Sequence, residues 1–333
     1  MTPPRGDVAF GHDDVRAALD SVRAARTPPA AARPLGIVRF LGPALLVSVG
    51  YMDPGNWATD LEGGARFGYD LLWVLLASNV MALLLQNFCA RLGIVSGTDL
   101  AAGCRREFSR PVGIGLWLLA EVAIVACDLA EVLGSAVALQ LLFGIPVLWG
   151  ALLTSVDVLV ILMLQRRGMR RLEAVVLVLL LTIGACMLME VWLAQPSASG
   201  ILHGLRPTLT GESLPIAIGI LGATVMPHNL YLHAALVPRV SPAQRPSALR
   251  RSFWSTALAL NLALLVNAAI LIVAAAVFWH RGLPIHDLRD AHQLLTPLLG
   301  SGIASVLFAV ALLCAGQSAT VSGTLAGQIV MEG

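Results

Sequence analysis

Long apolar stretches, separated by short polar segments, follow one another along most of the chain. A helix of about 20 residues is long enough to cross the roughly 30 Å hydrocarbon layer of a membrane. The pattern predicts eight such spans, at residues 36–66, 69–92, 112–136, 139–164, 172–194, 212–237, 253–280 and 302–330. We therefore expect an all-α polytopic membrane protein, with a cytoplasmic N-terminal tail at residues 1–34 and a transmembrane domain at residues 35–333.

The composition supports this class. Of the 333 residues, 57% are hydrophobic and 13% are charged, and the charged fraction is about half that of an ordinary soluble domain. The formal net charge is +2, so the charge indicates no nucleic-acid partner, and the expected partner is the lipid bilayer. The motifs GxxxxGK[ST], HExxH and GxSxG do not occur. We therefore expect a protein that is not an enzyme and that uses no ATP.

The arginines indicate how the spans are oriented. All 22 basic residues are arginine, and 18 of them fall in the N-terminal segment and in the connections between spans 2 and 3, 4 and 5, and 6 and 7. The other four are Arg66, Arg206, Arg281 and Arg289. Because positively charged connections stay on the cytoplasmic side, we expect a multi-pass protein of the cell membrane with its N-terminus in the cytoplasm.

Two spans contain helix-breaking residues at matching places. The first span contains the run Asp53-Pro54-Gly55-Asn56, and the sixth contains Met226-Pro227-His228-Asn229. Proline lacks an N–H group and clashes with the carbonyl four residues earlier, and glycine next to it weakens the helix further. Each proline is therefore predicted to free one backbone carbonyl, that of Gly50 in the first span and that of Ala223 in the sixth.

An odd separation of five spans inverts the second break relative to the first. This arrangement is typical of transporters with inverted repeats, whose substrate site lies at the broken helices near the middle of the membrane. The first repeat would cover about residues 36–194, and the second, incomplete repeat would cover about residues 212–333.

The residues at the breaks favour a cation. Asp53 places a carboxylate inside an apolar span. Burying this charge is costly, so Asp53 is a candidate functional residue. Asn56 and the freed carbonyls of Gly50 and Ala223 add neutral oxygens. Met226 adds a thioether sulfur, which favours softer transition metals over calcium and magnesium. The pattern therefore predicts a site for a divalent transition metal.

These two runs resemble the paired signatures of the Nramp family, the proton-coupled divalent metal transporters with a LeuT-like fold. Further matching stretches are Gly97-Thr98-Asp99-Leu100, Asp128-Leu129-Ala130-Glu131, His233 and Ala315-Gly316-Gln317-Ser318. The resemblance implies manganese or ferrous iron as the substrate, bound by Asp53, Asn56, Met226 and the carbonyls of Gly50 and Ala223. It implies no resident cofactor.

A second set of polar residues indicates a route for protons. Glu121, Asp128 and Glu131 are spaced so that all three lie near one face of the third span. Carboxylates on a membrane helix have to face protein or water. His228 and His233 in the sixth span titrate near neutral pH in the absence of other influences. In the resembled family, positions that match these are implicated in proton movement.

The chain differs from the family pattern at its C-terminal end, since family members carry at least ten spans and eight are predicted here. The expected fold is therefore a LeuT-like inverted repeat, with helices 1 and 6 broken, that is truncated after helix 8. A truncated product and a natural short form both stay open as explanations. The main functional hypothesis is proton-coupled import of manganese or ferrous iron by alternating access. The alternative is a transport-incompetent fragment that retains part of the metal site.

Overall fold

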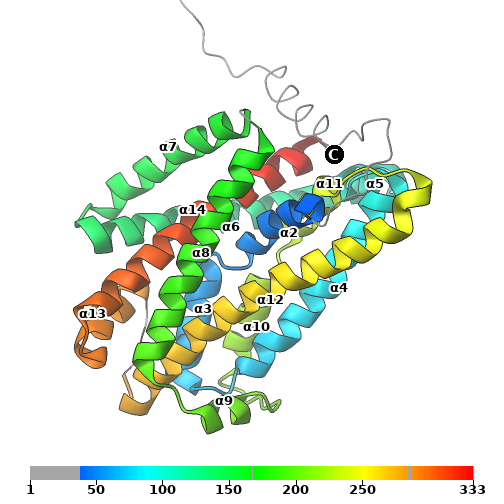
Figure 1. Ribbon diagram of the computed structural model, residues 1–333. Helices are drawn as coiled ribbons and strands as arrows, with labels where there is room; N and C mark the ends of the chain where they lie inside the picture. Colours follow the sequence, from blue (N-terminus) through cyan, green and yellow to red (C-terminus); the bar gives the residue numbers. More distant parts are fainter. Residues whose placement is uncertain (1–37, 167, 284, 286, 333) are drawn as a thin grey trace, which may run out of the picture.

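In the computed structural model, the described residues are 38–166, 168–283, 285 and 287–332 (Figure 1). Throughout these ranges the regular structure is helical, and no strand occurs. The helices in the first part of the chain are α2 (Val38–Gly50), α3 (Pro54–Phe67), α4 (Leu72–Ser96), α5 (Leu100–Glu107), α6 (Arg110–Phe143), α7 (Val147–Arg166) and α8 (Met169–Ala194). Those that follow are α9 (Ala198–Gly204), α10 (Leu214–Thr224), α11 (Pro227–Leu236), α12 (Arg245–Val277), α13 (Leu288–Leu299) and α14 (Gly302–Glu332), with short 3₁₀ turns at Pro242–Gln244 and Trp279–Arg281.

Each of the eight predicted spans corresponds to helix in the structure. Among the described residues, six helical segments are long and apolar enough to cross a membrane, and two shorter apolar helices lie at Phe40–Gly50 and Val147–Asp157. The first and sixth spans are each divided in two, as α2 with α3 and α10 with α11. The protein is therefore an integral membrane protein made of helices. The predicted tail at residues 1–34 lies outside the described residues.

The helices differ from the predicted spans at several places. The fourth span was predicted to begin at residue 139, but α7 begins at Val147. Helix α6 continues to Phe143, seven residues beyond the predicted end at 136, and stops where Gly144 adopts a left-handed φ of 69°. Helix α12 begins at Arg245 rather than near 253. Its first two turns are polar, so hydropathy did not reveal them. The segment after the seventh span, predicted as a loop, contains α13, whose N-terminus is capped by Asp287. Hydropathy marks where a chain is apolar, so it misses polar helical turns such as the start of α12. It also misses a helix end inside one apolar stretch, such as the end of α6.

The core forms around the first broken span. Its largest apolar cluster takes residues from α2, α3, α8, α12 and α14. Helices α3 and α12 approach closely at Gly64, where an added Cβ would overlap the Leu271 carbonyl and the Ala274 side chain. Trp57 of α3 is fully buried and packs edge-to-face on Phe308 of α14, with 5.3 Å between the ring centroids. Small residues thus let the helices that surround the break pack tightly.

The two broken spans run in opposite directions beside each other. Helix α2 packs on α11, and α3 packs on α10, so the first half of one span lies next to the second half of the other (Figure 1). This is the antiparallel pairing expected when five spans separate the breaks. It brings residues 53–56 and 223–229 to the same level of the bundle. The limits of the two proposed repeats remain a prediction.

Candidate metal-binding site

The first break has the geometry of a helix N-terminus. Asp53 is extended, with φ −66° and ψ 164°, and its side chain caps α3 by accepting a hydrogen bond from the Asn56 N–H. The Oδ1 atom of Asp53 lies 2.9 Å from Asn56 N and 2.5 Å from Asn56 Nδ2. Pro54 occupies the first helical position, where its missing N–H costs nothing. The carboxylate is therefore buried at the positive end of a helix dipole.

The second break follows the same plan without a charged cap. Helix α10 ends at Thr224, and Met226 is extended, with φ −87° and ψ 120°, immediately before Pro227 starts α11. Met226 is 3% exposed. The carbonyl of Ala223, which Pro227 was predicted to free, accepts a hydrogen bond of 3.1 Å from Asn56 Nδ2. The prolines thus leave a backbone carbonyl available to a group on the other broken span.

Asn56 connects the two breaks directly. Its Nδ2 atom lies within hydrogen-bonding distance of both Asp53 Oδ1 and the Ala223 carbonyl. Its Oδ1 atom accepts a hydrogen bond of 3.3 Å from the hydroxyl of Thr224. Two oxygens that bind one N–H₂ group are also close enough to bind one cation, and a rotation of the amide would present Asn56 Oδ1 beside them.

The other two residues that carry predicted ligands, Gly50 and Met226, both lie against Asn229 of α11. The Nδ2 atom of Asn229 lies 3.7 Å from the Met226 sulfur. The same amide lies against Gly50, where an added Cβ would overlap it. Gly50 and Met226 are therefore in contact with one side chain. The five predicted ligands form two groups at the paired breaks, one around Asn56 and one around Asn229.

These donors suit a cation that accepts neutral ligands. Among the residues that the structure describes, no three His, Cys, Asp or Glu side chains are clustered so that they could hold a metal. A site at the breaks would therefore combine one carboxylate with amide and backbone oxygens and one sulfur. An anion would be repelled by Asp53, whereas a divalent metal would compensate its buried charge.

The predicted proton-route carboxylates of α6 face α14. Gly323 of α14 lies so close to both Asp128 and Glu131 that an added Cβ would be 2.7 Å from Asp128 Oδ1 and 3.1 Å from Glu131 Oε2. Glu131 is 1% exposed. One turn further, Gly134 lies against the Pro54 ring, so this face of α6 leads to the first break. Glu121 is half-buried nearer the start of α6.

The two histidines of α11 have different surroundings. His233 Nδ1 lies 2.8 Å from Gln86 Oε1, and Gln86 Nε2 donates to the Tyr51 hydroxyl at 2.8 Å. His233 thus belongs to a hydrogen-bond network that ends at the first break, on the α4 side rather than beside α6. His228 is 1% exposed, and neither ring nitrogen has a partner in the described ranges.

Several buried polar groups were not predicted from the sequence. Asp60, about two helical turns after Asp53, is fully buried, and both of its carboxylate oxygens lack a partner among the described residues. Glu190 of α8 is 1% exposed in an apolar environment that includes Leu61 and Phe308. The rule that selected Asp53, a carboxylate inside an apolar span, also applies to both. Asn229 was visible in the second run of residues, but its contact with Gly50 depends on the fold.

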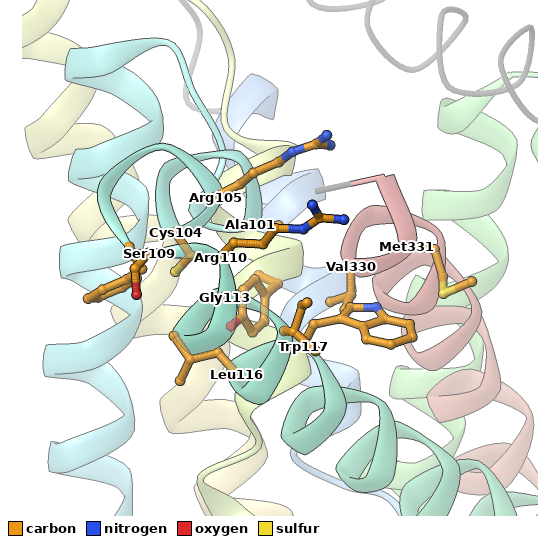
Figure 2. Close-up of a pocket in the computed structure, with 13 residues that line it drawn as sticks. Ala101, Cys104, Arg105, Ser109, Arg110, Gly113, Leu116, Trp117, Val330 and Met331 are labelled. Atoms are coloured by element: carbon orange, nitrogen blue, oxygen red, sulfur yellow. The ribbon is translucent and has the colours of Figure 1, made fainter.

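A separate cavity of about 520 Å³ lies between α5, the start of α6, α11 and the end of α14 (Figure 2). Arg105 and Arg110 extend over one side of it, and Trp117, Val330 and Met331 line another. None of the five predicted metal ligands lines this cavity. Two arginines would disfavour a metal cation, so the cavity is not the candidate site.

Helical membrane proteins whose site lies where two antiparallel helices are broken form a recognised class of transporter. Residues 44–333 match the model of one transporter family, natural resistance-associated macrophage protein-like, or Nramp. The chain belongs to the Nramp family. The relatives described next are transporters and not enzymes.

The chain is 51% identical over 300 residues to the natural resistance-associated macrophage protein 2 homolog of Dictyostelium discoideum, covering 88% of this chain and 48% of that protein. It is 50% identical over 343 residues to the divalent metal cation transporter MntH of a Nostoc species, covering 100% of this chain and 76% of that protein. The manganese transporter of Eremococcus coleocola has a similar structure, with 39% identity and a TM-score of 0.82, over 91% of this chain and 68% of that one. The chain thus spans about half of the Dictyostelium relative.

Proposed function

We propose that this protein moves divalent transition metal ions, manganese or ferrous iron, across the cell membrane together with protons. The ion would bind between the two breaks, and alternating access would expose that site to each side in turn. Asp53, Asn56, Met226 and the carbonyls of Gly50 and Ala223 are the proposed ligands.

The observation that carries this proposal is the bridge made by Asn56. One amide reaches the buried carboxylate of Asp53 and the carbonyl freed by Pro227, which lies 167 residues further along the chain. The proposed ligands are mostly buried oxygens from two discontinuous helices, and one of them is a carboxylate. A negatively charged site of this kind suits a cation better than an organic acid. The similarity to a divalent metal cation transporter and to a manganese transporter supports the same substrate class.

Protons would travel along α6. Asp128 and Glu131 share the Gly323 contact on α14, and Gly134 continues the same helix face to Pro54. A proton that leaves the vicinity of Asp53 would pass to Glu131 and Asp128, which lie on the helix that packs against Pro54. Glu121 would extend the route, and His228 and His233 would contribute from α11. We further propose that the N-terminus is cytoplasmic, on the basis of the arginine distribution.

Uptake into proteoliposomes tests this function. Purified protein in vesicles that contain a pH-sensitive dye should accumulate manganese when the outside is acidic, and the interior should acidify as the metal enters. Magnesium at the same concentration should produce neither signal. The Asp53→Asn variant, reconstituted at the same density, is the matched control and should show no uptake. Uptake by this variant equal to that of the parent would contradict the proposed site.

A further inference from the structure

Asn229 lies between two of the proposed metal ligands. It is the third residue of α11 and has no exposed surface. Its Nδ2 atom donates to the Met226 sulfur at 3.7 Å, and its amide fills the space beside Gly50. The side chain is therefore held between the end of α2 and the start of α11.

Gly50 is needed for the space that it leaves. It is not among the residues with a positive φ, so its backbone conformation does not require glycine. An added Cβ would instead overlap the Asn229 amide. The absence of a side chain at Gly50 thus allows the amide to reach the sulfur of Met226.

The remaining amide atom is unusual for a purely structural contact. Asn229 Oδ1 is buried and has no hydrogen-bond partner within the described part of the chain. Buried acceptors in proteins are rarely left without a hydrogen-bond partner. The contact of Nδ2 with the Met226 sulfur is thus the hydrogen bond that orients this amide.

A methionine sulfur binds a metal more favourably when its side chain is already held in the binding conformation. Methionine has three rotatable bonds and fills space without a fixed orientation, so an unrestrained sulfur loses conformational entropy when it binds an ion. The sulfur carries two lone pairs. An N–H donor on one of them fixes the side chain and leaves the other for the metal.

We propose, on the basis of the function proposed above, that Asn229 is a positioning residue for Met226 and thereby sets the preference of the site for soft metals. Asn229 acts through the sulfur, so its contribution depends on Met226 being present. Cadmium, which binds sulfur more strongly than manganese does, is the probe that reports this contribution.

The experiment is a double-mutant cycle. Isothermal titration of the full 333-residue chain in detergent with Cd²⁺ and with Mn²⁺ is carried out on the parent, Asn229→Ala, Met226→Ala and the double variant. Asn229→Ala should weaken Cd²⁺ binding about three- to fivefold, the loss of one modest hydrogen bond, and change Mn²⁺ binding by less than about twofold. In the Met226→Ala background the same change should have no further effect on either metal.

Two further variants keep the result interpretable. Gly50→Ala presses on the amide from the other side and should reproduce the loss of Cd²⁺ preference if Asn229→Ala does not fold. Asn79→Ala removes a different buried amide, which contacts Asn261 at 3.5 Å between α4 and α12, and should bind both metals as the parent does.

The outcomes separate the two proposals. A parent chain that binds neither metal refutes the proposed function, and the role of Asn229 with it. A parent that binds both metals, together with an Asn229→Ala effect that is absent or is equal in both backgrounds, refutes the positioning role and leaves the proposed function intact.

Discussion

Asp53 has two tasks in this structure, and two substitutions separate them. Its Oδ1 atom accepts hydrogen bonds from the Asn56 N–H at 2.9 Å and from Asn56 Nδ2 at 2.5 Å, and the same carboxylate is the proposed metal ligand. Asp53→Asn keeps an oxygen that can cap α3 but removes the charge, and Asp53→Ala removes both. Asparagine and aspartate cap helices about equally well, whereas alanine costs about 1 kcal/mol.

The expected magnitudes therefore differ between the two properties. Thermal unfolding in detergent should show Asp53→Ala less stable than Asp53→Asn by about 1 kcal/mol. Calorimetry should show that both variants lose Mn²⁺ affinity alike. A hydrogen bond to a charged group contributes about 1.5–3 kcal/mol. A metal–carboxylate contact is at least as strong, so the affinity should fall at least about 10-fold. Manganese binding by Asp53→Asn with the affinity of the parent would refute the assignment of the carboxylate as a ligand.

Three other predictions follow from the same geometry. Met226→Ala should still bind Mn²⁺ but should discriminate less against Ca²⁺ and Mg²⁺, which competition calorimetry measures; unchanged selectivity would exclude the sulfur as a ligand. Glu131→Gln should bind Mn²⁺ as the parent does but should lose proton influx coupled to uptake, and normal influx in dye-loaded vesicles would remove Glu131 from the proton route. Gly64→Ala should destabilise the protein by about 1–3 kcal/mol through its overlap with the Leu271 carbonyl, whereas Gly113→Ala, with no atom within 4 Å of its added Cβ, should not.

The breaks could be predicted from the sequence because their cause is local. Proline acts on its own helix, so Pro54 and Pro227 marked both breaks, and the odd number of spans between them predicted the antiparallel pairing seen in α2–α11 and α3–α10. The end of α6 could not be predicted in the same way. Residues 137–143 are as apolar as those before them, so hydropathy gave no signal until Gly144 and Pro146.

The contacts within the site depend on the fold. Asn56 and Ala223 are 167 residues apart, and only the packing of α3 on α10 brings them together. The contact of Asn229 with Gly50 likewise depends on packing, in this case of α2 on α11. Asp60 and Glu190, like Asp53, are carboxylates inside apolar spans, which makes them functional candidates. Neither lies at a proline break, so no further feature of the sequence indicated them.

We propose that one metal ion binds where the two broken helices meet. Crystals of the protein soaked in manganese and measured at the manganese absorption edge test it most directly, because anomalous scattering locates the ion itself. We expect one strong anomalous peak between Asp53 and Met226, within ligand distance of Asn56, and no such peak in Asp53→Asn crystals. A peak elsewhere in the bundle, with none between Asp53 and Met226, would contradict it.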